Sequence, residues 1–216
     1  MARPPEPEKR RALAQRAVVV LQHEGLDTSM TRLAEALEIK RPTLLYHFPT
    51  KGHIVEAALE ELLTDQATSV LAAIAEHQHP IDRLFAQMKA VHGYHHGREG
   101  YALFLGQAIA AASQDRINAI IEIGNRVFEA HREAQAARVR RGIEDGLVHP
   151  CDVDALMATL RAVQDGLIVQ RVMLGLDLEP VHQFIWSQLL RPLKRNAGEK
   201  AEANHSTRTP SEETSS

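Results

Sequence analysis

The 216 residues predict an all-α protein of about nine helices, because three properties of the sequence favour helices over strands. Alanine, leucine, glutamate, arginine and glutamine, all strong helix formers, dominate the composition. The 12 glycines and 10 prolines are few and lie mainly between apolar stripes. No segment alternates valine, isoleucine, threonine and tyrosine in the manner of a half-buried strand. A chain of this length can bury a sizeable core.

The first 52 residues predict three helices. The first carries an apolar stripe at helical spacing: Leu13, Ala14, Ala17, Val18 and Leu21. Gly25 suits the left-handed residue that often ends a helix. Ser29 is placed to cap a second, shorter helix. The third is very short, with Pro42 in its first turn and its end near Tyr46, before Pro49.

Longer helices follow. One is expected from Thr50 to the breaker at residues 77–80, and the next begins near Ile81 and is interrupted at Gly97. Residues 101–112 predict a helix rich in small side chains, of the kind that lies in a crowded interior.

The last third of the chain predicts three more helix boundaries. A long helix ends near Gly146, Asp152 caps a further helix, and the last helix follows Gly175. Beyond about Arg195 large apolar residues are absent, which predicts a disordered tail. We therefore expect three parts: a helix-turn-helix domain at residues 1–52, a helical body at 53–195 and a tail at 196–216.

The charge is unevenly distributed along the chain. The formal net charge is −3, yet residues 1–52 hold nine basic and six acidic side chains, and the rest holds 16 basic and 22 acidic ones. A basic end on an acidic body is the asymmetry expected when one end meets phosphate.

Residues 28–51 contain the most informative pattern. Two short helices flank a tight turn at residues 38–40, and Leu33, Ala34 and Leu44 can pack between them. The outer face of the second helix is then able to enter a DNA major groove, where cations and hydroxyls read phosphates and base edges. The DNA-facing residues expected here are Ser29, Lys40, Arg41, Pro42, Thr43, Tyr46, His47 and Lys51.

This segment resembles the tetracycline-repressor (TetR) family of bacterial regulators. The resemblance is carried by the N-terminal helix, Gly25, Leu33-Ala34, Pro42-Thr43-Leu44, Tyr46-His47-Phe48 and Lys51. It implies a homodimeric regulator of double-stranded operator DNA, by default a repressor, released by a small-molecule effector bound in the C-terminal domain. Two positions depart from the family: Glu38 replaces the usual turn glycine, and Leu45 replaces an aromatic residue.

The resemblance also implies an effector cavity between the central helices of the body. Such cavities are mostly apolar with a few convergent polar groups. The expected lining residues are polar or aromatic ones on otherwise apolar faces: Met88, His92, His95, Tyr101, Phe104, Gln107, Asn125, Phe128, His131 and Gln164.

A histidine cluster admits three interpretations. His92, His95 and His96 could be solvent-exposed at a helix end, act as polar anchors of the effector cavity, or bind a metal, since His92 and His96 lie one turn apart. No cysteine or carboxylate cluster accompanies them, so we expect no metal.

The final helix is apolar around much of its circumference, through Phe184, Ile185, Trp186, Leu189 and Leu190. One core face needs fewer apolar residues than this. By the resemblance, these residues form a dimer interface with the same helices of a second copy. Burial within the monomer is the alternative.

Other classes of function find little support. The sequence lacks a glycine-rich phosphate loop and a nucleophile elbow, so we expect neither catalysis nor a cofactor. Cys151 is alone, and the longest apolar run, residues 102–112, is too short to span a bilayer, so we expect a cytoplasmic protein. A helical enzyme and an adaptor without specific DNA binding remain the alternatives.

Overall fold

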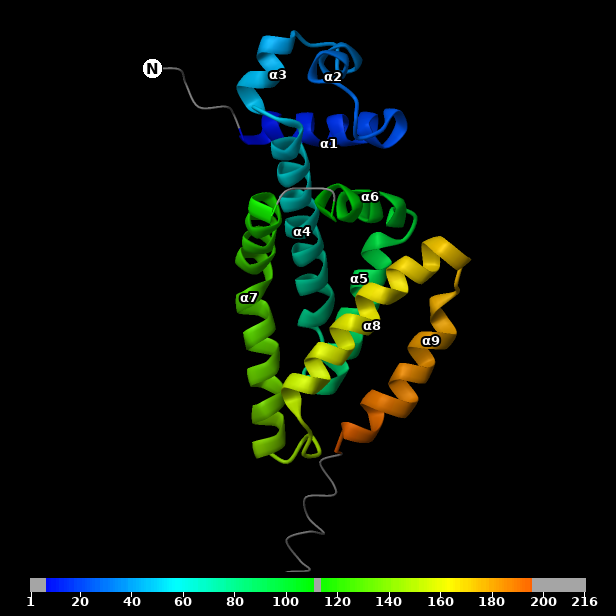
Figure 1. The fold of residues 1–216 in the computed structure, drawn as a ribbon. Coiled ribbons are helices and arrows are strands. Elements are labelled where there is room, and N and C mark those ends of the chain that lie inside the picture. The colour runs from blue at the N-terminus through cyan, green and yellow to red at the C-terminus, as the bar shows by residue number, and fades with distance from the viewer. Residues whose placement is uncertain (1–6, 111–113, 196–216) are drawn as a thin grey trace, which may run out of the picture.

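The computed structural model describes residues 7–110 and 114–195, which form a small helical head on a longer helical body (Figure 1). The all-α prediction is confirmed for these residues, whose only β-type pairing is an isolated bridge between Val148 and Lys194. The predicted tail at 196–216 and the first six residues of the predicted helix-turn-helix domain lie outside the described residues.

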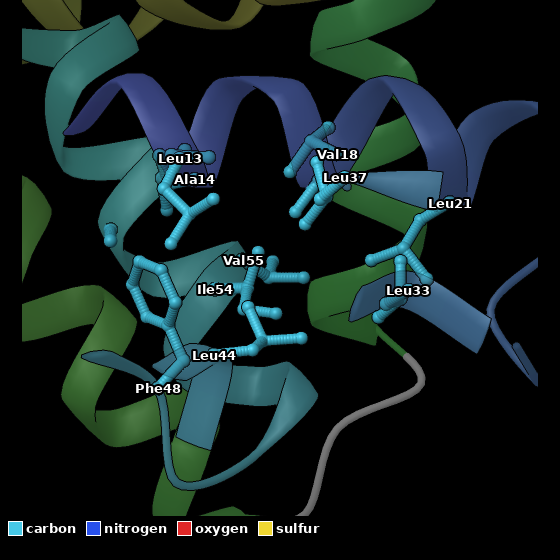
Figure 2. Packing of buried hydrophobic residues seen from close by; sticks show 14 of the residues in the cluster. Leu13, Ala14, Val18, Leu21, Leu33, Leu37, Leu44, Phe48, Ile54 and Val55 are labelled. Atoms are coloured by element: carbon cyan, nitrogen blue, oxygen red, sulfur yellow. The ribbon is translucent and has the colours of Figure 1, made fainter. Parts of the chain in front are cut away.

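The head consists of α1 (Pro7–Glu24), α2 (Met30–Ala36) and α3 (Arg41–His47). Its ends follow the predicted signals: Gly25 has a φ of 97°, and the Ser29 hydroxyl accepts a hydrogen bond from the Arg32 N–H at 3.1 Å. Figure 2 shows the core that these helices share with the following one. The labelled residues are Leu13, Ala14, Val18, Leu21, Leu33, Leu37, Leu44, Phe48, Ile54 and Val55.

Helix α4 (Lys51–Ala75) connects the head to the body as one continuous rod (Figure 1). Its 25 residues span about 37 Å at 1.5 Å per residue. Ile54 and Ala58 belong to the head core, and Val70 and Ile74 belong to a cluster within the body. The expected boundary between residues 52 and 53 therefore falls inside a single helix.

The body contains α5 (Pro80–His95), α6 (Glu99–Ala110), α7 (Gln114–Glu144), α8 (Val153–Leu174) and α9 (Leu178–Phe184). The last continues as a π-helical turn, Ile185–Leu190, and a 3-10 turn, Arg191–Leu193. In Figure 1, α6 lies below α1, α7 runs beside α4, and α8 crosses in front of α5.

The predicted ends of the body helices are also confirmed. The Asp152 carboxylate accepts a hydrogen bond from the Ala155 N–H at 3.0 Å, and Gly175 ends α8 with a φ of 63°. At the start of α5, His79 Nδ1 accepts from the Ile81 N–H, so the opposite ring nitrogen donates to the Leu147 carbonyl at 3.0 Å. Each end is determined by residues close in the sequence.

Candidate functional site

Helix α3 presents a polar outer face. Arg41, Pro42 and Thr43 are exposed in its first turn, and Tyr46 is 47% exposed one turn later. Lys40 precedes the helix as its N-cap residue and is exposed as well. Among the described residues, the side chains of Lys40 and Arg41 have no hydrogen bond or ion pair. The face thus offers two cations beside hydroxyl groups, which is the chemistry that reads phosphates and guanine edges.

His47 does not belong to this face, and its predicted exposure is wrong. Leu44, His47 and Phe48 have the i, i+3, i+4 spacing of one helix side, and that side packs into the head core. His47 is 7% exposed, and its Nδ1 has no hydrogen-bond partner in the described structure. Burial, followed by the charges of Lys9 and Arg10, lowers the pKa of His47.

Lys51 and Ser29 make hydrogen bonds within the head. Lys51 Nζ donates to the Leu26 carbonyl at 2.6 Å, which ties the loop after α1 to the start of α4. The Ser29 hydroxyl caps α2. Both residues therefore have a structural partner at the positions where we expected DNA contacts.

Two arginines of α1, which were not among the residues predicted from the sequence, contact the ends of α2 and α3 and so support the polar face of α3. Arg16 donates to the Leu37 carbonyl at 3.0 Å, at the end of α2. Arg10 lies over the Phe48 ring, 4.9 Å from its centroid, and donates to the His47 carbonyl. In the sequence, the feature that could have identified these two arginines is their position beside the apolar stripe of α1.

The turn between α2 and α3 keeps a left-handed residue although it lacks glycine. Glu38 has a φ of 58°, and the next residue, Ile39, donates its N–H to the Ala34 carbonyl at 2.9 Å. A side chain in this conformation costs about 1–2 kcal/mol. The turn thus holds the non-glycine residue Glu38 in the left-handed conformation.

A buried pair of histidines links α5 to α8 and α9. His92 Nε2 lies 2.9 Å from the Gln164 carbonyl, which can only accept, so this nitrogen carries a proton. His92 Nδ1 then accepts from His182 Nε2 at 2.7 Å, and the two rings stack with centroids 5.0 Å apart. His92 is 1% and His182 5% exposed. The hydrogen bond between the rings forms when both are neutral, and His182 Nδ1 has no hydrogen-bond partner in the described structure.

The neighbouring histidines differ from each other. His95 is buried and bonds to Gln66 Oε1 at 2.9 Å, whereas His96 is exposed. Within residues 7–110 and 114–195, no group of three His, Cys, Asp or Glu side chains is arranged to hold a metal ion. Of the three interpretations of the cluster, solvent exposure fits His96, whereas His92 and His95 are buried in internal hydrogen bonds, and their role as anchors of an effector cavity stays a prediction.

The ten expected effector-binding residues are dispersed. Met88, His92 and His95 are buried in packed contacts, while Gln107 and Asn125 are exposed. Tyr101 and Phe104 pack against the head core, and burial raises the pKa of Tyr101 to about 12. His131 bonds through Nε2 to Gln87 Oε1 at 3.2 Å, Phe128 is half-buried, and Gln164 serves His92 through its carbonyl.

The surface of the body is hollowed on α7 and beside Trp186. The hollow on α7, of about 490 Å³, includes Asn125 among its lining residues. The other, of about 670 Å³, lies between α4, α5 and Trp186. Apart from Asn125, the residues expected to line an effector cavity line neither hollow.

The five apolar residues expected at a dimer interface divide into two groups. Ile185 and Leu190 are buried in the core of the body, whereas Phe184 is 65% and Leu189 37% exposed. Trp186 is half-buried against Phe85. The end of α8 adds exposed apolar surface through Val172, Met173 and Leu174. Burial within the monomer thus holds for Ile185 and Leu190, and the dimer interface stays a prediction for the exposed Phe184 and Leu189.

Acid should destabilise the fold through its buried histidines. Burial is the largest cause that lowers the pKa of His92, His95, His131 and His182. Below about pH 6.5 the histidines of the unfolded chain bind protons that the buried histidines of the folded chain do not bind. The free energy of unfolding therefore decreases as the pH is lowered below this value, and it is retained above it. Urea unfolding at pH 5.5 should give a free energy of unfolding lower by about 1 kcal/mol or more than at pH 7.5.

A matched pair of variants checks this origin. His182→Gln keeps an amide donor for His92 but removes a titrating ring, so it should reduce the pH dependence. His23→Gln, at an exposed position of α1, should leave it unchanged. Equal pH dependence in wild type and His182→Gln would contradict the assignment.

The comparisons with known proteins agree with this geometry. The sequence model described as "Bacterial regulatory proteins, tetR family" matches residues 13–58, the segment from α1 to the first turns of α4. Searched against curated proteins, the chain has no significant match. In the described residues, no helix is both long and apolar enough to cross a membrane.

Several solved structures share the fold. PfmR, a TetR family transcriptional regulator from Thermus thermophilus, is 24% identical with a TM-score of 0.60, over 85% of this chain and 99% of that one. The ketosteroid transcriptional regulator KstR2 of Mycobacterium tuberculosis is 20% identical with a TM-score of 0.61, over 91% and 100%. The regulator FadR of Bacillus subtilis, in complex with stearoyl-CoA, is 15% identical with a TM-score of 0.67, over 82% and 96%.

Proposed function

We propose that the chain is a transcriptional regulator of the tetR family, whose sequence model matches residues 13–58, and that it binds a near-palindromic operator as a homodimer. The observation that supports this best is the outer face of α3, where Lys40, Arg41 and Thr43 are exposed on a braced helix. Two such helices, one from each subunit, enter successive major grooves about 34–36 Å apart or somewhat more.

The proposed dimer forms through α8 and α9. Met173 and Leu174 are 70% and 72% exposed, and Phe184 is 65% exposed. Large apolar side chains gathered on two neighbouring helices are typical of a protein–protein contact. A second copy that places the same helices against them removes this surface from water and sets the separation of the two heads.

The proposed regulation is release from DNA by a small molecule bound in the body, with repression as the default outcome. Among the structural neighbours, FadR of Bacillus subtilis is in complex with stearoyl-CoA, and KstR2 is named a ketosteroid transcriptional regulator. A ligand shifts the DNA-binding equilibrium only if its affinity differs between the two head spacings.

Two features support transmission from body to head. Helix α4 has one end in the head core and the other in the body. Arg171 of α8 bonds to the Glu99 carboxylate of α6 at 3.0 Å and to the His92 carbonyl of α5 at 3.4 Å. Movement of α8 is thereby coupled to the start of α6, and α6 contributes Leu105 to the head core.

Substitution of Arg41 tests the proposed DNA-binding face. Selection from a random DNA pool should yield a near-palindrome, and Arg41→Ala should weaken binding to it by about 1–3 kcal/mol, some 5- to 150-fold, if Arg41 reads a base. Lys40→Ala should weaken binding more evenly across sequences and reduce the salt dependence by about one phosphate contact. Gel-shift titrations in a salt series measure both effects.

Arg140→Ala is the matched control. Arg140 is an exposed arginine of α7 that pairs with Asp154 at 2.6 Å, far from α3 in the sequence and outside the head. Its loss should leave DNA affinity unchanged. The proposal fails if no sequence is enriched over random DNA, or if Arg41→Ala and Arg140→Ala bind alike.

A further inference from the structure

The larger hollow of the body lies outside the set of residues expected to bind an effector. Its volume is about 670 Å³, within the range of small-molecule sites. Its lining comes from the end of α4, His77 in the loop that follows, one face of α5 and the π-helical turn after α9. On α5 the lining positions 82, 85, 86, 89 and 90 recur at helical spacing, so a single side of that helix forms the floor.

Small side chains create the space. Ala73 of α4 and Ala86 and Ala90 of α5 line the hollow, where longer side chains would fill it. Ala86 and Ala90 pack on the buried cluster of Val70, Ile74 and Val91, so they have a firm apolar base.

One wall is aromatic. Phe85 and Trp186 both line the hollow, with ring centroids 5.0 Å apart and planes tilted by 34°. On its core side, the Phe85 ring packs edge-to-face against the His182 ring, with the two ring centroids 6.4 Å apart. This contact holds the Phe85 ring in place. A flat ring of a ligand can contact such a wall with the offset or edgewise geometry that aromatic pairs prefer.

Lys89 supplies ammonium donors at one end of the hollow, beside the carboxylate of Glu179. Lys89 Nζ lies 5.9 Å from the centroid of the Phe85 ring, and Glu179 accepts one bond from it at 3.3 Å. An ammonium group has three donors, so further bonds are open to a ligand. At the other end, the Asp82 carboxylate is neutralised by Lys194 at 2.7 Å.

From this geometry we infer that the hollow is a binding site for a small aromatic carboxylate. The ring lies against Phe85 and Trp186, the alanines accept its apolar edge, and the carboxylate bonds to Lys89. As a binding site it stands independently of DNA; as the effector site it rests on the proposed function.

Trp186 reports on the site directly, because it is the only tryptophan of the chain. The probes are 3-phenylpropionate, 3-phenylpropanol and 3-phenylpropylamine, which share a ring and a chain and differ in charge. Titrated into the full-length protein without DNA, the carboxylate should change tryptophan emission saturably, with an affinity at least tenfold higher than that of the alcohol or the amine.

Two variants separate the charge from the cavity. Lys89→Met keeps the apolar stem and should reduce carboxylate affinity at least tenfold, to that of the alcohol. Ala90→Leu should fill the hollow and weaken both ligands, with the melting temperature confirming the fold. Arg161→Met removes an exposed arginine of α8, which pairs with Asp165, and should change nothing. Absence of saturable binding, equal affinity for all three probes, or an unaffected Lys89→Met variant would each overturn the inference.

A parallel gel shift distinguishes this failure from failure of the regulatory proposal. If the carboxylate binds but never alters affinity for the selected palindrome, the site exists and does not control DNA binding. If the palindrome is bound and no probe reaches Trp186, the regulator stands and the inferred site is wrong.

Discussion

Replacing Phe184 with glutamate should convert the proposed dimer into a monomer and lower affinity for the proposed operator at least a hundredfold. Phe184 is 65% exposed on α9, so a carboxylate there would be buried against apolar surface in a dimer formed through α8 and α9. An unpaired buried charge costs several kcal/mol. A monomer holds only one half-site, and loss of the linked second head removes an avidity on the order of 10²–10⁴.

Light scattering after gel filtration measures the mass, and a gel shift with the selected palindrome measures the affinity. Ile121→Glu is the matched control, since Ile121 is 55% exposed on α7, outside the proposed interface. It should leave both mass and affinity unchanged. A Phe184→Glu protein that stays dimeric at micromolar concentration would place the interface elsewhere.

Gly142→Ala should destabilise the body by about 1–3 kcal/mol, because the site has no room for a methyl group. A Cβ there would lie 2.8 Å from Val148 Cγ2 and 2.9 Å from Pro80 Cγ. Valine is branched at Cβ and proline is a ring, so neither neighbour can turn away cheaply. The backbone of α7 or of the α5 start must shift instead. Urea unfolding measures the loss.

Gly124 provides an opposite result within the same helix. A Cβ at Gly124 of α7 would meet no atom within 4 Å. Gly124→Ala should therefore stabilise the protein by about 0.5–1 kcal/mol through helix propensity alone. If the two substitutions shift stability in the same direction, close packing between α7, Pro80 and Val148 is not the controlling factor.

The ends of the helices and the fold of the head could be predicted from the sequence because they depend on residues a few positions apart in the chain. Ser29 caps α2 through a residue three positions later, as Asp152 does for α8. The polar face of α3 likewise lies within one short segment. The orientation of His47 was not accessible, because Leu44 and Leu45 are both apolar and only packing against α1 decides which side turns inward.

The interior of the body required the tertiary structure. His92 and His182 are 90 positions apart in the sequence, and their bond exists because α5 and α9 pack together. The residues expected to bind an effector were predicted from the apolar face of each helix separately. In the folded protein some of them are buried and others are exposed. The hollow beside Trp186 depends on α4, α5 and the turn after α9 at once.

The sequence by itself determined the helical class, the boundaries of most helices and the helix-turn-helix segment that is proposed to bind DNA, because caps, breakers and apolar periodicity act over three or four residues. Only the tertiary structure decided which polar groups pair, which apolar surface is left exposed and where a ligand-sized space remains. Those properties depend on the distance and rotation between helices, which long-range packing sets.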